Sequence, residues 1–426
     1  MRVVLVNKFH YRKGGSETYY FAVADALREM GHEVHFFAME DEKNLPCTDA
    51  DLFVPNRDYN GPSSPVAKAS AALSIVYSGE AKRRFQTLCE RVRPDVVHMN
   101  LVHRQITLSI LDAPYLREHH VPVVWTAHDY IAVCPSYTML DGAGEVCEAC
   151  LGEHFSNCLK RKCIKGSAAK SGLAMLEAGF LRRTHAYRKI DRIICPSQFL
   201  ESKMAEGGFS TGQLVWMPNF LPGDALATVG DRAVSGKEPY FLYLGRLSKE
   251  KGVDVLIESF ARAWGEGKTP GWRLVIAGDG PERDRLERLA AARGLGGTVR
   301  FAGYVAGTAR DGLLYDARYA CVPSVWNENA PYSVLEAMAA GVPVIGSRIG
   351  GIPELVHDRV TGLLFRPGDT GSLAGLIGRA ASMDTEAYEA MSRGCRAFAA
   401  SECSEKKYME DLVMLYGELI AEKRGN

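Results

Sequence analysis

The chain has 426 residues, of which 46% are hydrophobic and 24% charged, and its formal net charge is zero. This length exceeds what one ordinary hydrophobic core organises, so it predicts two domains of a soluble globular protein. A zero net charge argues against binding to nucleic acid through bulk positive charge, and we expect no nucleic-acid partner.

The ordering of apolar residues argues against membrane insertion and secretion. No stretch approaches the roughly 20 apolar residues that a membrane-spanning helix needs. The apolar run Val3–Val6 is too short for the core of a signal peptide, and no small-residue cleavage site follows it. We therefore expect a cytoplasmic protein in which the 11 cysteines are mostly reduced.

The first half of the chain alternates short apolar runs with helical patterns. The predicted strands are Val3–Val6, Val34–Phe37, Val96–His98, Val121–Thr126 and Arg192–Cys195. The predicted helices are Ser16–Met30, Ala81–Val92 and Lys170–Arg188. A turn-rich segment around Pro218 and a low-complexity run to Pro239 then interrupt the pattern.

The same alternation restarts after Pro239. The predicted strands are Tyr240–Leu244, Arg273–Ala277, Val299–Gly303, Tyr319–Val322, Pro343–Gly346 and Leu363–Phe365. The predicted helices between them include Val253–Ala263 and Glu282–Arg293. Repeated β-then-α units predict an α/β fold of two Rossmann-like, doubly wound parallel-sheet domains that face a central cleft. We expect these domains to cover residues 1–218 and 219–404.

The chain ends in a predicted helix, which we place within residues 405–426. Leu412, Leu415 and Leu419 recur at helical spacing between about Glu405 and Lys423. This apolar face needs a partner, and we expect the helix to pack back on the first domain.

The most informative motif is NENAPYSVLEAMAAGVPV, from Asn327 to Val344. Glu328 and Glu336 lie on either side of a predicted helix start, so their side chains are expected to converge near one helix N-terminus. Free amides there suit an anion, whereas carboxylates accept hydrogen bonds from sugar or ribose hydroxyls. This combination predicts a nucleotide-sugar pocket.

A second motif, GRLSKEKG, follows the predicted strand Tyr240–Leu244. An arginine can bind phosphate oxygens through two parallel hydrogen bonds, and a lysine supplies a point charge, so Arg246 and Lys251 are suited to a diphosphate without a metal ion. A solvated charged loop explains the same residues equally well.

Three weaker motifs lie near predicted strand ends. Gly14 and Gly15 open a helix and allow close backbone approach to a ligand, but a tight turn needs no ligand. His128 is placed to contact a sugar hydroxyl, although a strand-end histidine more often bonds to nearby backbone. We interpret Gly278 to Pro281 as a turn with Pro281 at the first helical position, and Asp49 to Asp51 as a loop.

Five cysteines gather in one short stretch. They are Cys134, Cys147, Cys150, Cys158 and Cys163. The last four fit a structural zinc site, which would leave no open position for catalysis. Free thiols in a reducing compartment are the alternative.

The segment from Lys160 to Lys189 contains nine Lys or Arg residues and a single acid, Glu177. Leu173, Leu176 and Phe180 recur there at helical spacing, which is suited to an anionic membrane surface. A helix packed on its own sheet with a solvated basic face is the favoured interpretation.

Taken together, these motifs resemble the retaining glycosyltransferases of family 4, which have the GT-B fold. The segments that carry the resemblance are GGSE (14–17), GRLSKEKG (245–252), LVIAGDGP (274–281), VRFAGYV (299–305), PSVWNENAPYSVLEAMAAGVPVIGS (323–347), SRIGGIPELV (347–356) and TGLLFRPGD (361–369). Their order and spacing cover nearly the whole chain and are specific in combination.

The resemblance implies a role for each matching residue. Arg246 and Lys251 match the basic pair at the donor diphosphate, Glu336 the ribose-binding glutamate, and Glu328 the glutamate beside the donor sugar. The backbone at Asn329 and Ala330 is expected to touch that sugar, His128 to approach it, Gly14 and Gly15 to line the phosphate and acceptor side, and Tyr304 and Val305 to hold the base. Many members have Gly-Phe after the first glutamate, whereas this chain has Asn329-Ala330-Pro331-Tyr332, which leaves the donor sugar open.

The implied activity is transfer of a sugar from a UDP- or GDP-sugar to a glycan or lipid-linked acceptor, with the anomeric configuration retained and no catalytic metal ion. Surface polysaccharide or glycolipid synthesis at the inner face of the plasma membrane fits the basic segment. A nucleotide-sugar epimerase on the same fold and a non-catalytic binding subunit are the alternatives. The first lacks identifiable acid and base groups, and the intact set of charged residues argues against the second.

Overall fold

The computed structural model describes residues 1–56, 73–223 and 237–425. Most of the low-complexity run before Pro239 falls outside these ranges. The chain divides into two compact units, Met1–Met217 with Lys406–Asn426 (unit 1) and Pro218–Glu405 (unit 2). Within the described ranges, no helix has the length and apolar character needed to span a membrane.

Unit 1 contains a six-stranded parallel sheet with the order β2-β1-β3-β4-β5-β6. Its strands are β1 (Arg2–Val6), β2 (Glu33–Phe37), β3 (Val96–Met99), β4 (Val123–Thr126), β5 (Arg192–Cys195) and β6 (Leu214–Trp216). The inner strands are nearly continuous apolar runs and are buried, as expected for a sheet covered on both faces by helices.

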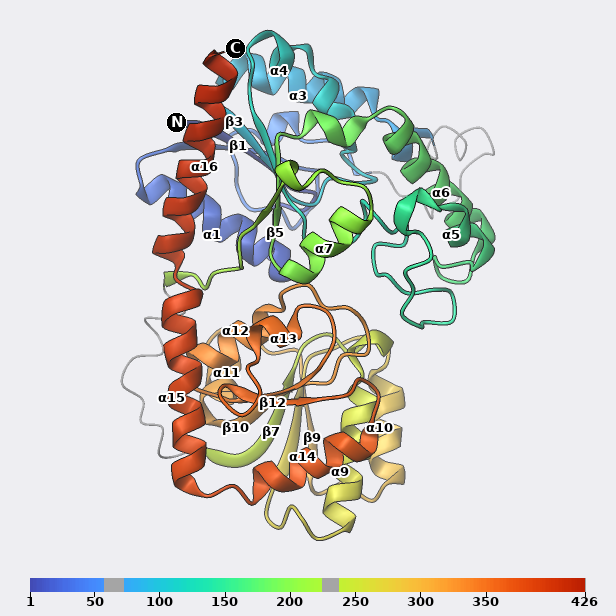
Figure 1. Ribbon diagram of the computed structural model, residues 1–426, viewed down its shortest axis with the longest axis vertical. Coiled ribbons are helices and arrows are strands. Elements are labelled where there is room, and N and C mark those ends of the chain that lie inside the picture. Colours follow the sequence, from blue (N-terminus) through green and yellow to red (C-terminus); the bar gives the residue numbers. More distant parts are fainter. Residues whose placement is uncertain (57–72, 224–236, 426) are drawn as a thin grey trace. The chain divides into compact units, whose positions relative to one another are not determined.

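Helices and short 3-10 turns connect these strands (Figure 1). The helices of unit 1 are α1 (Gly15–Glu29), α3 (Gly79–Val92), α4 (Pro114–Glu118), α5 (Ser156–Lys160), α6 (Ala168–Arg183), α7 (Gln198–Glu206) and α16 (Glu405–Gly425). The 3-10 turns are η1 (Ala50–Leu52), η2 (Leu108–Asp112), η3 (Leu151–Glu153), η4 (Ala186–Lys189) and η5 (Thr211–Gln213).

The predicted helix Lys170–Arg188 is wrong at both ends. Helix α6 begins at Ala168, where the Ser167 hydroxyl accepts a hydrogen bond from the Lys170 amide and caps the first turn. It ends at Arg183 because His185 adopts a left-handed conformation, with a φ of 53°, which an α-helix cannot accommodate. The separate turn η4 follows.

Helix α16 packs against the sheet of unit 1, and Figure 1 shows it beside α1 and β3. The Tyr408 hydroxyl lies 2.7 Å from the Tyr19 hydroxyl of α1, and the Tyr416 hydroxyl lies 2.5 Å from His98 Nδ1 of β3. Leu412 and Leu419 are buried on the same face. These contacts join residues more than 300 positions apart in sequence.

Unit 2 contains a second six-stranded parallel sheet, with the order β12-β11-β10-β7-β8-β9. Its strands are β7 (Glu238–Leu244), β8 (Arg273–Ala277), β9 (Val299–Gly303), β10 (Ala317–Val322), β11 (Val344–Ser347) and β12 (Gly362–Phe365). The helices are η6 (Lys249–Lys251, a 3-10 turn), α9 (Val253–Gly265), α10 (Arg283–Ala292), α11 (Gly307–Asp316), α12 (Tyr332–Ala339), α13 (Ile352–Leu355), α14 (Thr370–Ala381) and α15 (Thr385–Glu402).

The prediction that Pro281 occupies the first helical position is also wrong. Helix α10 begins at Arg283, and the Arg283 amide instead donates to the Gly280 carbonyl in a preceding turn. Gly278 has a φ of 141°, and a Cβ there would lie 1.8 Å from the Gly245 carbonyl oxygen. The segment is therefore shaped by its close approach to the loop after β7.

Candidate active site

The order of strands in unit 2 determines where its loops meet. After β7, the chain adds β8 and β9 on one side and then crosses to place β10 on the other side of β7. The crevice at such a topological switch point, beyond the carboxyl ends of the strands, is the usual ligand site of an open α/β sheet. The loops after β7 and β10 carry Arg246, Lys251 and Glu328 to this point.

Lys251 and Glu328 form an ion pair here. Lys251 Nζ donates to Glu328 Oε1 at 2.7 Å, and the Ser324 hydroxyl donates to the same oxygen at 2.6 Å. Burial alone would raise the pKa of Glu328, but the Lys251 charge and these hydrogen bonds outweigh it and lower the pKa. Glu328 is therefore an ionised carboxylate that is only 5% exposed.

Arg246 has the opposite character. The Arg246 side chain is exposed, and it forms no ion pair with another residue that the structure describes. The loop behind it is held rigidly, because the Tyr243 hydroxyl donates to the Arg246 carbonyl at 2.7 Å and the Leu247 amide donates to the Asp279 carbonyl at 2.9 Å. A free guanidinium on a fixed loop is suited to an incoming anion.

Glu336 lies inside α12 and has a different cationic partner. Arg310 Nη1 of α11 donates to Glu336 Oε1 at 2.9 Å, and Arg310 also pairs with Asp311. Burial raises the pKa of Glu336, while Arg310 opposes that rise. The structure thus brings Lys251 and Glu328 together, and separately brings Arg310 and Glu336 together.

The loop between Asn327 and Pro331, here called the 327–331 loop, is held by backbone contacts. The Gly351 amide donates to the Glu328 carbonyl at 2.7 Å. A Cβ on Gly350, which has a φ of 57°, would lie 2.2 Å from the same carbonyl oxygen. No larger residue fits there without moving the loop, so Gly350 fixes the position of Glu328.

No sequence motif pointed to Asn219, which the structure brings to the 327–331 loop. Asn219 Nδ2 donates to the Ala330 carbonyl at 3.1 Å, which leaves Oδ1 as a buried acceptor without a hydrogen-bond partner. Asn327 Nδ2 is likewise buried and unpartnered. Such atoms are costly unless a ligand or water satisfies them. The sequence places Asn219 in a turn-rich segment, and no local signal assigns it to this loop.

Tyr304 and Val305 follow β9 on the same edge of the sheet. Tyr304 is 78% exposed, and Val305 packs against the buried cluster that includes Val275 and Leu314. Their placement at a strand end is compatible with contact to a base, and their role stays a prediction.

In unit 1, Gly14 and Gly15 are exposed at the start of α1, and Gly14 is its N-cap. His128 follows β4, and its Nε2 lies 2.9 Å from Asn100 Oδ1. Asn100 Nδ2 faces the Val6 carbonyl at 3.5 Å, so Nε2 carries the proton and Nδ1 is left as an acceptor. Burial lowers the pKa of His128 to about 3, which keeps the imidazole neutral at pH 7.

Two family models match this chain. The model described as "Glycosyltransferase Family 4" matches residues 13–222, and the model described as "Glycosyl transferases group 1" matches residues 230–408. The chain belongs to glycosyltransferase family 4. Its two parallel-sheet domains are those of the GT-B fold.

Curated relatives of this family 4 chain match part of its length. An α-D-kanosaminyltransferase from Streptomyces kanamyceticus is 30% identical over 42% of this chain and 46% of its own length. A lipopolysaccharide core biosynthesis glycosyltransferase from Rhizobium meliloti is 31% identical over 46% of this chain and 55% of its own length. The chain therefore spans about half the length of these relatives.

A solved GT-B structure, Anabaena HepE in complex with UDP-glucose, superposes over 98% of this chain and 100% of its own chain. Its TM-score is 0.66 at 17% sequence identity, which supports the fold alone.

The family 4 resemblance did not point to a buried group of charges in unit 1. Arg104 Nε lies 3.5 Å from Glu177 Oε2, and Glu177 is 4% exposed. Burial raises the pKa of Glu177 to about 7, against the pull of Arg104. Burial likewise raises the pKa of Asp129 to about 6 and lowers the pKa of Lys8 to about 8. These residues follow β1, β3 and β4 or lie on α6, so only the fold assembles them.

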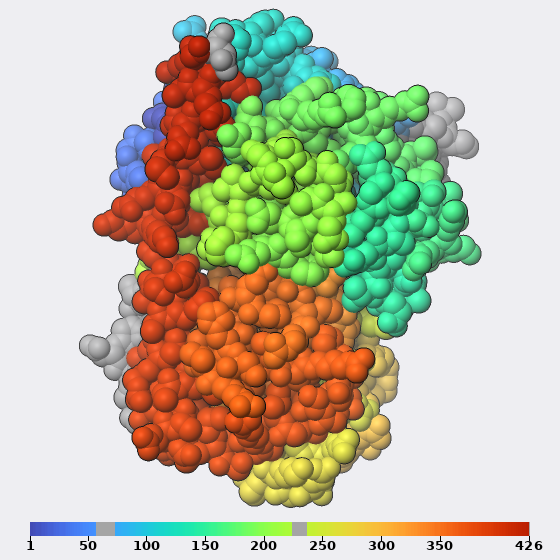
Figure 2. All heavy atoms as spheres, in the orientation of Figure 1, coloured from blue at the N-terminus to red at the C-terminus, as the bar shows by residue number. Residues whose placement is uncertain are grey.

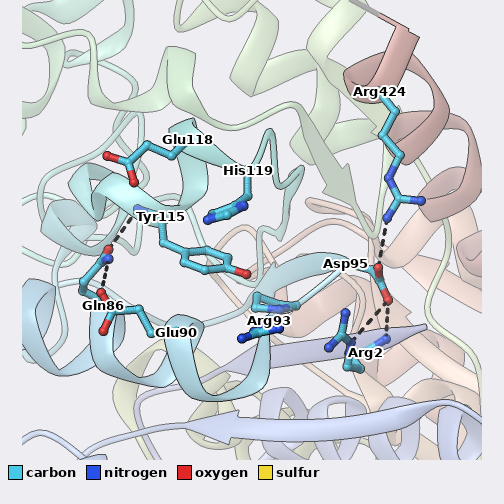
Figure 3. Close-up of a pocket in the computed structure, with 10 residues that line it drawn as sticks. Arg2, Gln86, Glu90, Arg93, Asp95, Tyr115, Glu118, His119 and Arg424 are labelled. Carbon is cyan, nitrogen blue, oxygen red and sulfur yellow. Dashed lines mark hydrogen bonds and ion pairs between the residues drawn. The ribbon is translucent and has the colours of Figure 1, made fainter.

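A separate pocket of about 600 Å³ lies at the amino ends of the strands of the unit 1 sheet (Figure 3). Arg2 begins β1 and Asp95 directly precedes β3, so this pocket faces the amino ends of the strands. Asp95 accepts from the Arg2 amide at 2.8 Å and from Arg424 Nη2 of α16 at 3.1 Å. We infer that these contacts anchor α16, because ligands of an open α/β sheet are expected at the carboxyl ends of the strands.

The predicted zinc ligands lie in unit 1, far along the chain from the 327–331 loop; they are Cys147, Cys150, Cys158 and Cys163. All are free thiols. Over the described part of the chain, no three His, Cys, Asp or Glu side chains are already arranged to hold a metal ion together. Zinc binding stays a prediction.

Proposed function

We propose that this protein transfers a sugar from a nucleoside diphosphate sugar to an acceptor hydroxyl, with the anomeric configuration retained. The main support is the Lys251–Glu328 pair at the switch point of unit 2, next to the exposed Arg246. A diphosphate needs cations, and a sugar needs hydrogen-bond acceptors beside them. Unit 2 offers both on neighbouring loops.

The proposed chemistry needs little from the protein beyond position and charge. The bond between the anomeric carbon and the diphosphate oxygen breaks, and a bond from that carbon to the acceptor oxygen forms on the same face. The acceptor proton passes to the departing diphosphate oxygen. Arg246 and Lys251 stabilise the negative charge on the leaving group, so the proposed step requires no metal ion.

We propose UDP- or GDP-sugars as donors. HepE, which shares the fold, is described in complex with UDP-glucose. In this chain, Glu336 is proposed to accept hydrogen bonds from the ribose hydroxyls, and the backbone of Asn329 and Ala330 to contact the sugar. Arg310 is proposed to orient Glu336 through their 2.9 Å contact.

We propose a glycan or lipid-linked acceptor, used in surface polysaccharide or glycolipid synthesis at the inner face of the plasma membrane. The relative described as a lipopolysaccharide core glycosyltransferase supports this assignment. Helix α6 adds further support, because Leu176 is 61% exposed and Phe180 38% exposed within the basic segment. Sedimentation with phosphatidylglycerol vesicles but not phosphatidylcholine vesicles is expected, and Leu176→Ser should weaken it. Equal binding to both vesicles would contradict the membrane assignment.

The function is tested with UDP-, GDP- and ADP-glucose, and the corresponding galactose and N-acetylglucosamine donors, in buffer containing EDTA. We expect one nucleotide series to bind and to be hydrolysed slowly. Glu328→Gln should hydrolyse the donor far more slowly, with a far-ultraviolet circular dichroism spectrum that still shows the folded protein. NMR of the released sugar should show the donor's anomeric configuration at early times. Absence of binding by every nucleotide would refute the proposal, and an inverted product would refute retention.

A further inference from the structure

Five thiols of unit 1 lie within one short stretch of the sequence. This cysteine cluster consists of Cys134, Cys147, Cys150, Cys158 and Cys163. Cys150 and Cys158 share a buried apolar cluster with Phe155 and Ala178, and Cys163 packs against it.

Backbone amides already point at two of these sulfur atoms. The amides of Ser136 and Met139 donate to Cys134, and the amide of Cys158 donates to Cys150. A side-chain hydrogen bond also joins Cys158 and Cys163. N–H donors aimed at sulfur stabilise the thiolate, which is the form that binds metal ions.

The surrounding segment, residues 134–167, is here called the cysteine lobe, and Figure 2 shows it in teal and green on the molecular surface. It contains only a β-bridge between Leu140 and Val146 and the short elements η3 and α5. Cys134 and Met139 of the lobe join the main core of unit 1, and its other buried apolar residues are Cys150, Phe155 and Cys158, which pack with Ala178 of α6. So small a core contributes little stability, and natural segments of this kind are usually held by a metal ion or disulfides.

The backbone of the lobe is strained in addition. Its non-glycine residues with positive φ are Tyr137, Met139, Glu153, Lys162 and Lys165, at 60°, 50°, 70°, 49° and 51°. Each such residue costs about 1 kcal/mol or more, and the conformation persists only where other interactions impose it. The weak core and this strain together call for a further cross-link.

We propose that the cysteine cluster binds one Zn²⁺ through four thiolates, those of Cys150, Cys158, Cys163 and either Cys134 or Cys147, and that this ion holds the lobe together. The sulfur atoms do not yet converge within the described residues, so the thiols must rotate between staggered rotamers to reach one point. Four thiols lose their protons to solvent as four zinc–sulfur bonds form. Four thiolates leave no open position, so the ion is structural.

The test uses the full chain, purified with a phosphine reductant and without added metal. Mass spectrometry of the metal content should give about one zinc ion per chain. Exchange with Co²⁺ should produce the visible and near-ultraviolet bands of a tetrahedral thiolate site. A zinc chelator should lower the melting temperature and expose the lobe to limited proteolysis.

Serine variants identify the ligands. Cys150→Ser, Cys158→Ser and Cys163→Ser should each lose most of the bound zinc, and loss in either Cys134→Ser or Cys147→Ser identifies the fourth thiolate. Cys47→Ser is the matched control, because Cys47 is also half-buried and its sulfur accepts the Asp49 amide at 3.4 Å, but it lies outside the lobe. This control should retain its zinc.

Reduced protein that contains no zinc and gives no thiolate bands with Co²⁺ would overturn the proposal. A Cys158–Cys163 disulfide in metal-free protein purified without reductant would also overturn it, because the cross-link would then be covalent. The metal readouts need no donor or acceptor, so their outcome is independent of the proposed transfer activity.

Discussion

Lys251 Nζ lies 2.7 Å from Glu328 Oε1, although the two residues are 77 positions apart in the sequence. The pair exists because β7 and β10 are neighbours in the sheet of unit 2. Lys251 is thus engaged by a carboxylate before any ligand arrives. A bound diphosphate would share this cation with Glu328, which couples the phosphate position to the sugar position.

Removal of the Lys251 ammonium should affect both stability and activity. Lys251→Ala leaves the almost fully buried Glu328 carboxyl group without its cation, so its pKa should rise and the free energy of unfolding should fall by about 3 kcal/mol. Transfer should be lost as well. Chemical denaturation and a transfer assay measure the two effects.

The control for this variant is Arg273→Ala. Arg273 pairs with Glu238 at 2.5 Å, but both side chains are about half exposed, so the loss should stay below about 1 kcal/mol. Equal losses for the two variants would contradict the special role of the buried pair.

Arg246→Ala should weaken nucleotide binding and leave stability unchanged. Its guanidinium is exposed and forms no ion pair within the part of the chain that the structure describes. It therefore contributes little to the free energy of unfolding. A lost charge-assisted contact to the diphosphate should raise the Kd about tenfold or more. Isothermal titration calorimetry with the nucleoside diphosphate measures this change. Arg300→Ala, an exposed arginine on β9, is the control and should bind normally.

Asn219→Ala should reduce discrimination between the sugar nucleotide and the bare nucleoside diphosphate. The unpartnered Oδ1 of Asn219 lies beside the 327–331 loop, and under the proposed function a sugar hydroxyl would donate a hydrogen bond to it. We expect the affinity ratio of the two ligands to fall several-fold, at about 1 kcal/mol for one hydrogen bond. Asn44→Ala is the matched control and should leave the ratio unchanged. Asn44 Nδ2 donates to the Met39 carbonyl at 2.8 Å, and its Oδ1 is also buried without a hydrogen-bond partner. An unchanged ratio in Asn219→Ala would show that Asn219 only supports the loop.

Glu177→Gln should change how stability depends on pH. Burial raises the pKa of Glu177 from 4.5 to about 7 in the folded protein, so the folded state keeps a proton that the unfolded state releases. The contribution of this proton to the free energy of unfolding is fully present below pH 4.5. It is lost as the pH rises towards 7. Glu177→Gln has no titrating carboxyl group at this position, so its free energy of unfolding does not fall in this way. Its stability relative to the wild type should therefore rise across this window, by at most about 1.4 kcal/mol per pH unit.

Denaturation curves at several pH values measure this difference. Glu118→Gln, which removes an exposed carboxylate of unit 1, is the control for the change in net charge. A difference between Glu177→Gln and the wild type that stays flat from pH 4.5 to 7 would contradict the assignment.

The sequence by itself determined the local structure and the residue types of the candidate site. Apolar runs of strand length alternate with helical periods, and these patterns predicted the parallel sheets and most of the helices. The loops with Arg246 and Lys251, and with Glu328, directly follow such runs, so their place at strand ends was readable. Helix ends were not readable where one residue decides them, as His185 does after α6.

Only the tertiary structure decided which of these residues meet. The crossover that sets β10 beside β7 depends on how helices and strands pack over the whole unit, and no local period encodes it. The same packing gave Glu336 its partner Arg310 and brought Asn219 to Ala330 across 111 positions. Local propensity acts over a few residues, whereas these contacts form only after distant apolar faces are buried together.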